Sequence, residues 1–196
     1  MTTLRAWPSL LAGLVLMLAG CAQVSHVPAG QAVVGQRMVV DLDRGWNQFA
    51  NLGSGTMPTW TREGITVDKL VFYAGLRSGD LIAPTPAEPK GQPALIYRAE
   101  MKAADIVSLF ERLYTRGGST FTLDNVSQES FVGVPGYRFE FSSIRKSDDV
   151  RLRGVGWFAQ RDGELFAITY TAPRLAFFPA GIGSAESIAH SARAKI

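Results

Sequence analysis

The chain has 196 residues, of which 46% are hydrophobic and 10% aromatic, and its formal net charge is +3. This composition excludes an intrinsically disordered protein. The small positive charge argues against nucleic acid as a partner, because nucleic-acid binding needs basic residues concentrated on one face. The single cysteine excludes an intramolecular disulfide, so the fold depends on its hydrophobic core.

Residues 1–20 have the three parts of an export signal. Arg5 and the terminal amine give a positive start, residues 10–19 form an apolar run, and small residues precede Cys21. Ten or so apolar residues are too few for a hydrocarbon core that needs about 20 in a helix. We therefore expect a processed leader rather than a membrane span.

The segment Leu18-Ala19-Gly20-Cys21 resembles the lipobox of bacterial lipoproteins. The resemblance implies that Cys21 is thioether-linked to diacylglycerol, becomes the mature N-terminus and is N-acylated, for example with palmitate. Two or three acyl chains give stable anchoring, with membrane lipid as the partner. Ala22, in place of an aspartate, favours the periplasmic face of the outer membrane. The alternative is an ordinary signal peptide followed by a free thiol.

After the cysteine, residues 21–33 are small, polar and uncharged, which predicts a lipidated tether. Residues 34–196 are then expected to form one domain. Its first half predicts strands at 37–43, 68–76 and 94–101, and a proline-rich loop at 83–93. A helix is predicted at 103–115, where four apolar residues repeat at helical spacing before a glycine pair: Ile106, Leu109, Phe110 and Leu113.

The pair Asp162-Gly163 is typical of a two-residue hairpin turn and predicts the register of the strands around it. Trp157 should lie opposite Ile168, and Ala159 opposite Phe166. The alternation places the larger apolar side chains on one core-facing side of the hairpin, with a lighter set on the other.

The strand at 136–143 should join the same antiparallel sheet. A last helix is predicted at 184–193 with Ser184 as its cap and Ala185, Ile188, Ala189 and Ala192 facing inward. The order of elements indicates an α+β fold in which helices cover an antiparallel sheet as an α/β/α sandwich.

Five segments together resemble the PsbP-like fold: "VVDLDRGWNQF", the central helix, "VPGYRFEFSS", the hairpin ending in "ITYTAP", and "ESIAHSAR". Members of this family include the PsbP extrinsic subunit of photosystem II, a Ran-binding nuclear-import protein and bacterial envelope lipoproteins. The resemblance implies a noncatalytic, protein-binding role and assigns no functional residues.

One candidate contact patch is evident. Arg145, Lys146, Arg151 and Arg153 surround a loop between two predicted strands and could meet an acidic partner or anionic headgroups. The alternative is a solvated edge that discourages aggregation. No motif indicates a cofactor, a metal site or a catalytic residue. Glu186 and His190 are interpreted as a solvated pair on one helix face.

These observations favour a periplasmic lipoprotein, anchored to the outer membrane, with a noncatalytic role in binding another envelope protein or assisting assembly. The first alternative is a lipoprotein that binds a small apolar ligand between sheet and helix. A cell-wall hydrolase using His190 is the third.

Overall fold

The computed structural model describes residues 24–49, 57–83 and 93–195. The predicted leader and Cys21 lie outside the described residues, as does most of the proline-rich loop at 83–93. Two helices and eleven strands are present in the described part. The α+β class and the antiparallel sheet predicted from the sequence are confirmed.

The main sheet has eight strands, and every neighbouring pair in it is antiparallel. In spatial order these are β1 (Val24–Val27), β4 (Trp46–Phe49), β5 (Thr59–Thr61), β6 (Lys69–Leu76), β10 (Glu164–Pro173), β9 (Arg151–Arg161), β8 (Val134–Ile144) and β7 (Thr122–Phe131). A smaller sheet contains β11 (Arg193–Ala194), β3 (Met38–Leu42) and β2 (Gly30–Val34).

The hairpin β9–β10 has the predicted register: Trp157 lies opposite Ile168, and Ala159 opposite Phe166. Asp162 and Gly163 have φ values of 54° and 79°, as a type I′ turn requires at both central positions. Both faces of the hairpin are buried. The face with the larger apolar side chains packs in one core, and the face with the smaller side chains packs in a second core on the other side of the sheet.

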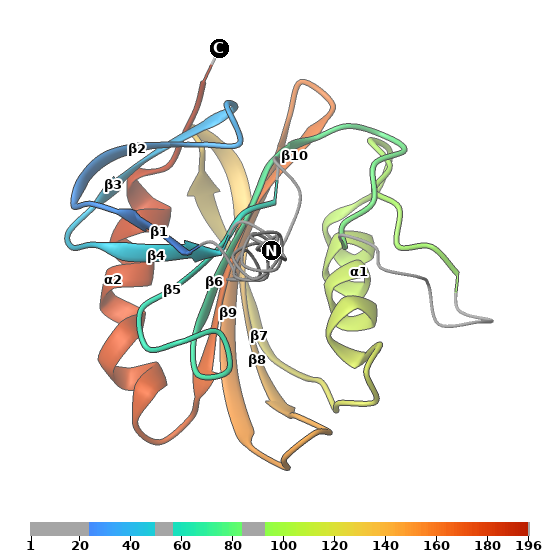
Figure 1. Ribbon diagram of the computed structural model, residues 1–196. Helices are drawn as coiled ribbons and strands as arrows, with labels where there is room; N and C mark the ends of the chain where they lie inside the picture. The colour runs from blue at the N-terminus through green and yellow to red at the C-terminus, as the bar shows by residue number, and fades with distance from the viewer. Residues whose placement is uncertain (1–23, 50–56, 84–92, 196) are drawn as a thin grey trace, which may run out of the picture.

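Helix α1 (Ala103–Thr115) has the predicted bounds and covers one face of the main sheet (Figure 1). The Asp105 carboxylate accepts the Lys102 backbone N–H at 2.9 Å, and Gly118 ends the helix with φ of 82°. The apolar face of α1 packs in a core with aromatic side chains of the sheet: Tyr73, Phe139, Phe141 and Phe158.

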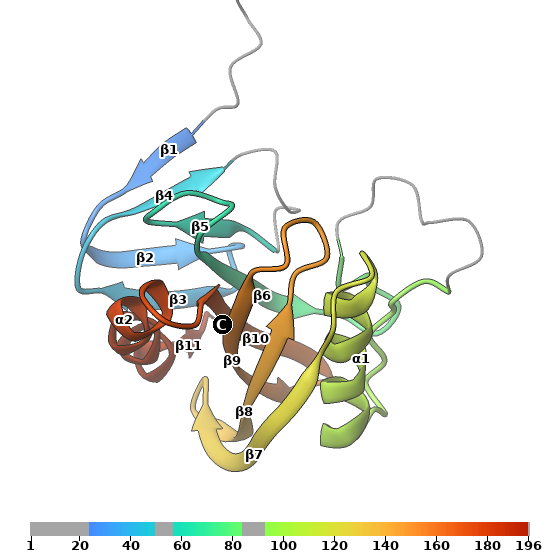
Figure 2. The same ribbon diagram turned by 90° about the horizontal axis from the view of Figure 1, so that it is seen from below.

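Helix α2 (Phe177–Ser191) covers the other face, where the small sheet shares its core (Figures 1 and 2). The predicted inward residues of this helix are buried. The prediction that Ser184 caps the helix was wrong, because α2 begins at Phe177 and Ser184 lies inside it. The Ser184 hydroxyl instead donates to Asp43 Oδ1 at 2.5 Å.

Two further expectations differ from the structure. Residues 94–101 form no extended strand; only Ile96 makes an isolated bridge, to Leu81. Within the predicted tether, residues 24–27 and 30–33 belong to β1 and β2, which pair with β4 and β3. Backbone pairing, rather than apolar pattern, orders this polar segment.

Candidate functional site

The predicted basic patch divides into paired and unpaired cations. Arg145 forms a two-pronged ion pair with Asp148, with distances of 2.8 and 2.6 Å, and also donates to the Thr66 carbonyl. Arg153 donates to Glu140 Oε2 at 2.6 Å. These two charges are therefore largely neutralised within the domain, and Arg151 and Lys146 form no ion pair among the described residues.

Arg151 lies beside Arg174, a residue that the sequence did not single out. The Arg174 backbone N–H donates to the Arg151 carbonyl at 3.0 Å, which continues the hairpin ladder one step beyond Pro173 and Leu152. The hairpin register therefore places the two arginines opposite each other. In the described part of the chain, no carboxylate forms an ion pair with either guanidinium.

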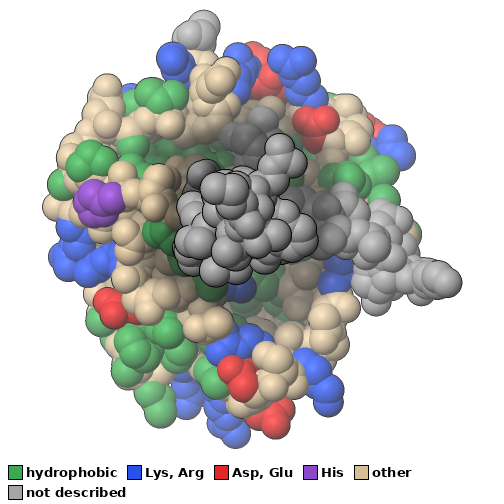
Figure 3. Space-filling model, in the orientation of Figure 1, with side chains coloured by type: hydrophobic (Ala, Val, Ile, Leu, Met, Phe, Trp, Pro, Cys, Tyr) green, Lys and Arg blue, Asp and Glu red, His purple; other side chains and the backbone are tan. Residues whose placement is uncertain are grey.

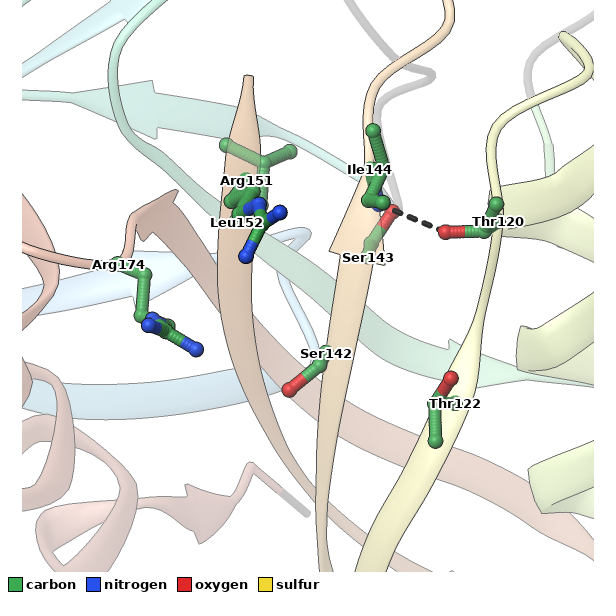
Figure 4. Close-up of a pocket in the computed structure, with 8 residues that line it drawn as sticks. All are labelled: Thr120, Thr122, Ser142, Ser143, Ile144, Arg151, Leu152 and Arg174. Carbon is green, nitrogen blue, oxygen red and sulfur yellow. Dashed lines mark hydrogen bonds between the residues drawn. The ribbon is translucent and has the colours of Figure 1, made fainter. Parts of the chain in front are cut away.

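A groove lies beside these two arginines and crosses the ends of β10, β9 and β8 and the start of β7. Figure 4 shows Arg174 and Arg151 on its β10 and β9 side and the hydroxyls of Ser142, Thr120 and Thr122 toward β8 and β7. The backbone N–H of Ile144 donates to Thr120 Oγ1 at 2.9 Å, which ties β8 to the start of β7. The volume of this part of the groove is about 270 Å³.

The groove continues over an apolar shelf of about 570 Å³ that begins at the same two arginines. Leu175 is 86% exposed and Phe177 38% exposed on this shelf. The other walls are formed by the turn before β9 and the connection from β10 to α2: Asp149, Val150, Pro173 and Ala176. Figure 3 shows apolar side chains beside charged side chains of both signs at the lower end of the molecule. We call the two parts together the end groove.

A charge network connects β8, β9 and α2. Arg138 contacts Glu140 on β8 and donates to Glu186 Oε1 on α2 at 3.2 Å, and its guanidinium lies 5.8 Å from the centroid of the Trp157 ring. The hydrogen bond from Arg138 lowers the pKa of Glu140, burial opposes this shift, and the hydrogen bond from Arg153 adds to it. The network joins the sheet to the helix through charged hydrogen bonds.

Replacing Glu140 with glutamine should lower the free energy of unfolding by about 1–2 kcal/mol at neutral pH, because Arg138 and Arg153 lose a shared negative charge and one of its two acceptor oxygens. The pKa of Glu140 in the folded protein lies below its ordinary value of 4.5. The stabilisation that ionised Glu140 provides is therefore fully present above pH 4.5 and is lost as the pH falls through the pKa of the folded protein. Urea denaturation of both proteins at neutral and acid pH measures the difference. It should shrink on acidification, and an equal difference at both pH values would contradict the network. Glu111→Gln, on the exposed face of α1, is the control.

The remaining candidate chemistry is occupied by structural contacts. His190 Nε2 lies 3.0 Å from Glu129 Oε1 on β7, and Glu186 contacts Arg138, so His190 and Glu186 have separate partners. The Asp41 carboxylate accepts from Arg193 at 3.0 and 3.1 Å. Among the described residues, no cluster of three potential metal ligands is found.

The buried aromatics do not add to the site. Trp46, Trp60 and Phe178 are buried in the core, whereas Phe177, next to Phe178 in the chain, is 38% exposed. Within residues 24–49, 57–83 and 93–195, neither helix has the length and apolar character needed to cross a bilayer.

Comparison with known proteins identifies the fold. The chain is similar to the solution structure of cyanobacterial PsbP (CyanoP) from Synechocystis sp. PCC 6803, with a TM-score of 0.55, 11% identity, and coverage of 90% of this chain and 95% of that chain. It also matches LpqN, involved in cell envelope biogenesis of Mycobacterium tuberculosis, with a TM-score of 0.37, 10% identity, and coverage of 88% and 92%. No family model and no curated relative matches the sequence. The first comparison supports the predicted PsbP-like fold.

Proposed function

We propose that the protein is a membrane-anchored envelope lipoprotein whose folded domain has a noncatalytic role in binding another envelope protein. The anchor is the acylated Cys21, and the lipobox-like leader favours the periplasmic face of the outer membrane. The protein acts by localisation: the anchor confines the domain near the membrane and raises the effective concentration of the domain for its partner.

The observation that carries the binding role is the end groove. Leu175 is 86% exposed beside two arginines that have no carboxylate partner in the described part of the chain. Exposed apolar side chains next to cations are typical of recognition surfaces, whereas His190, Glu186 and Asp41 are each held in a structural pair. A binding protein explains this distribution better than a hydrolase does, because the ring of His190 is joined to a carboxylate and to no described serine.

The alternative, a small apolar ligand between sheet and helix, has less support. The space between the sheet and α1 contains closely packed aromatic and aliphatic side chains, and so does the space between the sheet and α2. A ligand there would have to displace this core. Protein interiors are close-packed, and such displacement is costly.

Cys21→Ser should abolish acylation and move the protein from the membrane fraction to the aqueous fraction, because the sulfur that carries the diacylglycerol is lost. Palmitate labelling followed by membrane fractionation measures this. Ala22→Asp is the matched control: it leaves the cysteine in place and should shift the labelled protein toward the inner membrane. Retention of the label by Cys21→Ser would contradict the anchor.

A further inference from the structure

We propose that the end groove binds an acidic, aliphatic segment of the partner protein, with its carboxylates between Arg151 and Arg174 and its aliphatic side chains against Leu175 and Phe177. This inference deepens the proposed function and depends on it, since it names the chemistry of the partner.

The first support is the arrangement of the two arginines. They occupy opposing positions at the end of the β9–β10 ladder, joined by the 3.0 Å hydrogen bond from Arg174 N to the Arg151 carbonyl. Like charges directly opposite each other destabilise a strand pair. Arg145 and Arg153 nearby each have a carboxylate partner, whereas Arg151, Arg174 and Lys146 form no ion pair among the described residues. An incoming carboxylate would remove this repulsion and make charge-assisted hydrogen bonds.

The second support is the apolar surface that continues from the arginines. Val150 and Pro173, which are half-buried, line it together with the exposed side chains of Leu175 and Phe177. An exposed leucine gains by burial in a complex, whereas a purely ionic ligand would leave it in water. The groove therefore favours a segment that carries both carboxylates and aliphatic side chains.

The shape favours a protein segment over a bilayer. The two parts of the end groove have volumes of about 270 and about 570 Å³, which is room for several side chains of a peptide segment. Asp149 lines the apolar shelf and forms no ion pair among the described residues. Its carboxylate would repel a continuous anionic surface, whereas a single segment can place its charges at the arginines alone.

The test uses the full-length protein in its own envelope, with a photo-crosslinking amino acid in place of Leu175. The crosslinked product is digested, and the captured segment is mapped by mass spectrometry. We expect a protein segment with at least two carboxylates near aliphatic residues. The same crosslinker in place of Glu111, on the exposed face of α1, should not capture that segment.

Arg151→Gln combined with Arg174→Gln should reduce the Leu175 crosslink about tenfold, because both cations that pair with the carboxylates of the segment are lost. Arg98→Gln combined with Arg112→Gln removes two exposed arginines elsewhere and should leave the crosslink unchanged. A synthetic peptide of the mapped sequence should bind the purified protein, and its affinity should fall as salt rises from about 50 to about 500 mM.

Four outcomes would overturn the inference: capture of lipid, capture of a second copy of this chain, capture of a segment without carboxylates, or no capture. An unchanged crosslink in the double arginine variant would do the same. All of these outcomes are distinguishable from failure of the proposed function. That failure would appear as an unaltered protein that is not acylated or not associated with the membrane.

Discussion

Trp157→Ala is expected to lower the free energy of unfolding by about 3–5 kcal/mol, the range for removal of a large buried aromatic side chain. Trp157 is completely buried and packs in the core between the main sheet and α2. The cavity would open beneath Arg138, whose guanidinium covers the ring. Equilibrium urea denaturation measures the change, and a value below about 1 kcal/mol would show that this core is not the one described.

Trp157→Phe is the matched control. The Trp157 indole N–H is buried with no hydrogen-bond partner in the described part of the chain. Phenylalanine removes this unsatisfied donor and keeps most of the apolar contact, so we expect a much smaller loss, below about 1.5 kcal/mol. If both variants lost the same stability, the indole N–H would have a role that the packing does not explain.

Gly156→Val should destabilise the fold by about 3 kcal/mol or more, at the upper end of the overpacking range. Gly156 lies opposite Phe139 on β8, and a Cβ placed there would overlap the Phe139 ring. Gly154 has the same relation to Phe141 on the same face of the sheet. The two glycines of β9 thus leave room for aromatic rings that fill the core beneath α1.

Gly117→Val provides the comparison, because a Cβ at Gly117 meets nothing within 4 Å. Its free energy of unfolding should change by less than about 0.5 kcal/mol in a denaturation experiment. Equal losses for the valine variants at 156 and 117 would attribute the effect to loss of glycine itself. A tolerated valine at 156 would show that Phe139 does not lie over this position.

Strong local signals made part of the fold predictable. The Asp162-Gly163 turn specifies the register of a long hairpin by itself, and the apolar period followed by Gly117-Gly118 defines α1. The edge strand β7 lacks such a signal. Seven of its ten residues are exposed, its sequence has no apolar alternation, and only pairing with β8 makes it a strand.

Helix α2 shows how packing overrides propensity. Pro179, Gly181 and Gly183 lower the helix propensity of its first half, so the sequence predicts a start near Ser184. In the structure, a Cβ at Gly181 would overlap the Tyr170 hydroxyl. The glycine therefore allows the helix to approach the sheet closely, and the burial gained there stabilises a segment that is a poor helix former.

The candidate site was predicted only in part, for a similar reason. The sequence indicated the charges around the turn before β9 but could not show that Arg145 and Arg153 are neutralised by Asp148 and Glu140. Arg174 was missed although a signal existed: extending the hairpin register beyond Pro173 places it opposite Arg151. The exposure of Leu175 depends on where α2 begins, which the sequence did not predict correctly.

Intact mass analysis of the mature protein extracted from membranes tests the proposed anchor at Cys21 most directly. The proposal predicts a polypeptide that begins at Cys21 and carries diacylglycerol together with an N-linked acyl chain. A polypeptide with an unmodified cysteine, or one that begins at another residue, would contradict it.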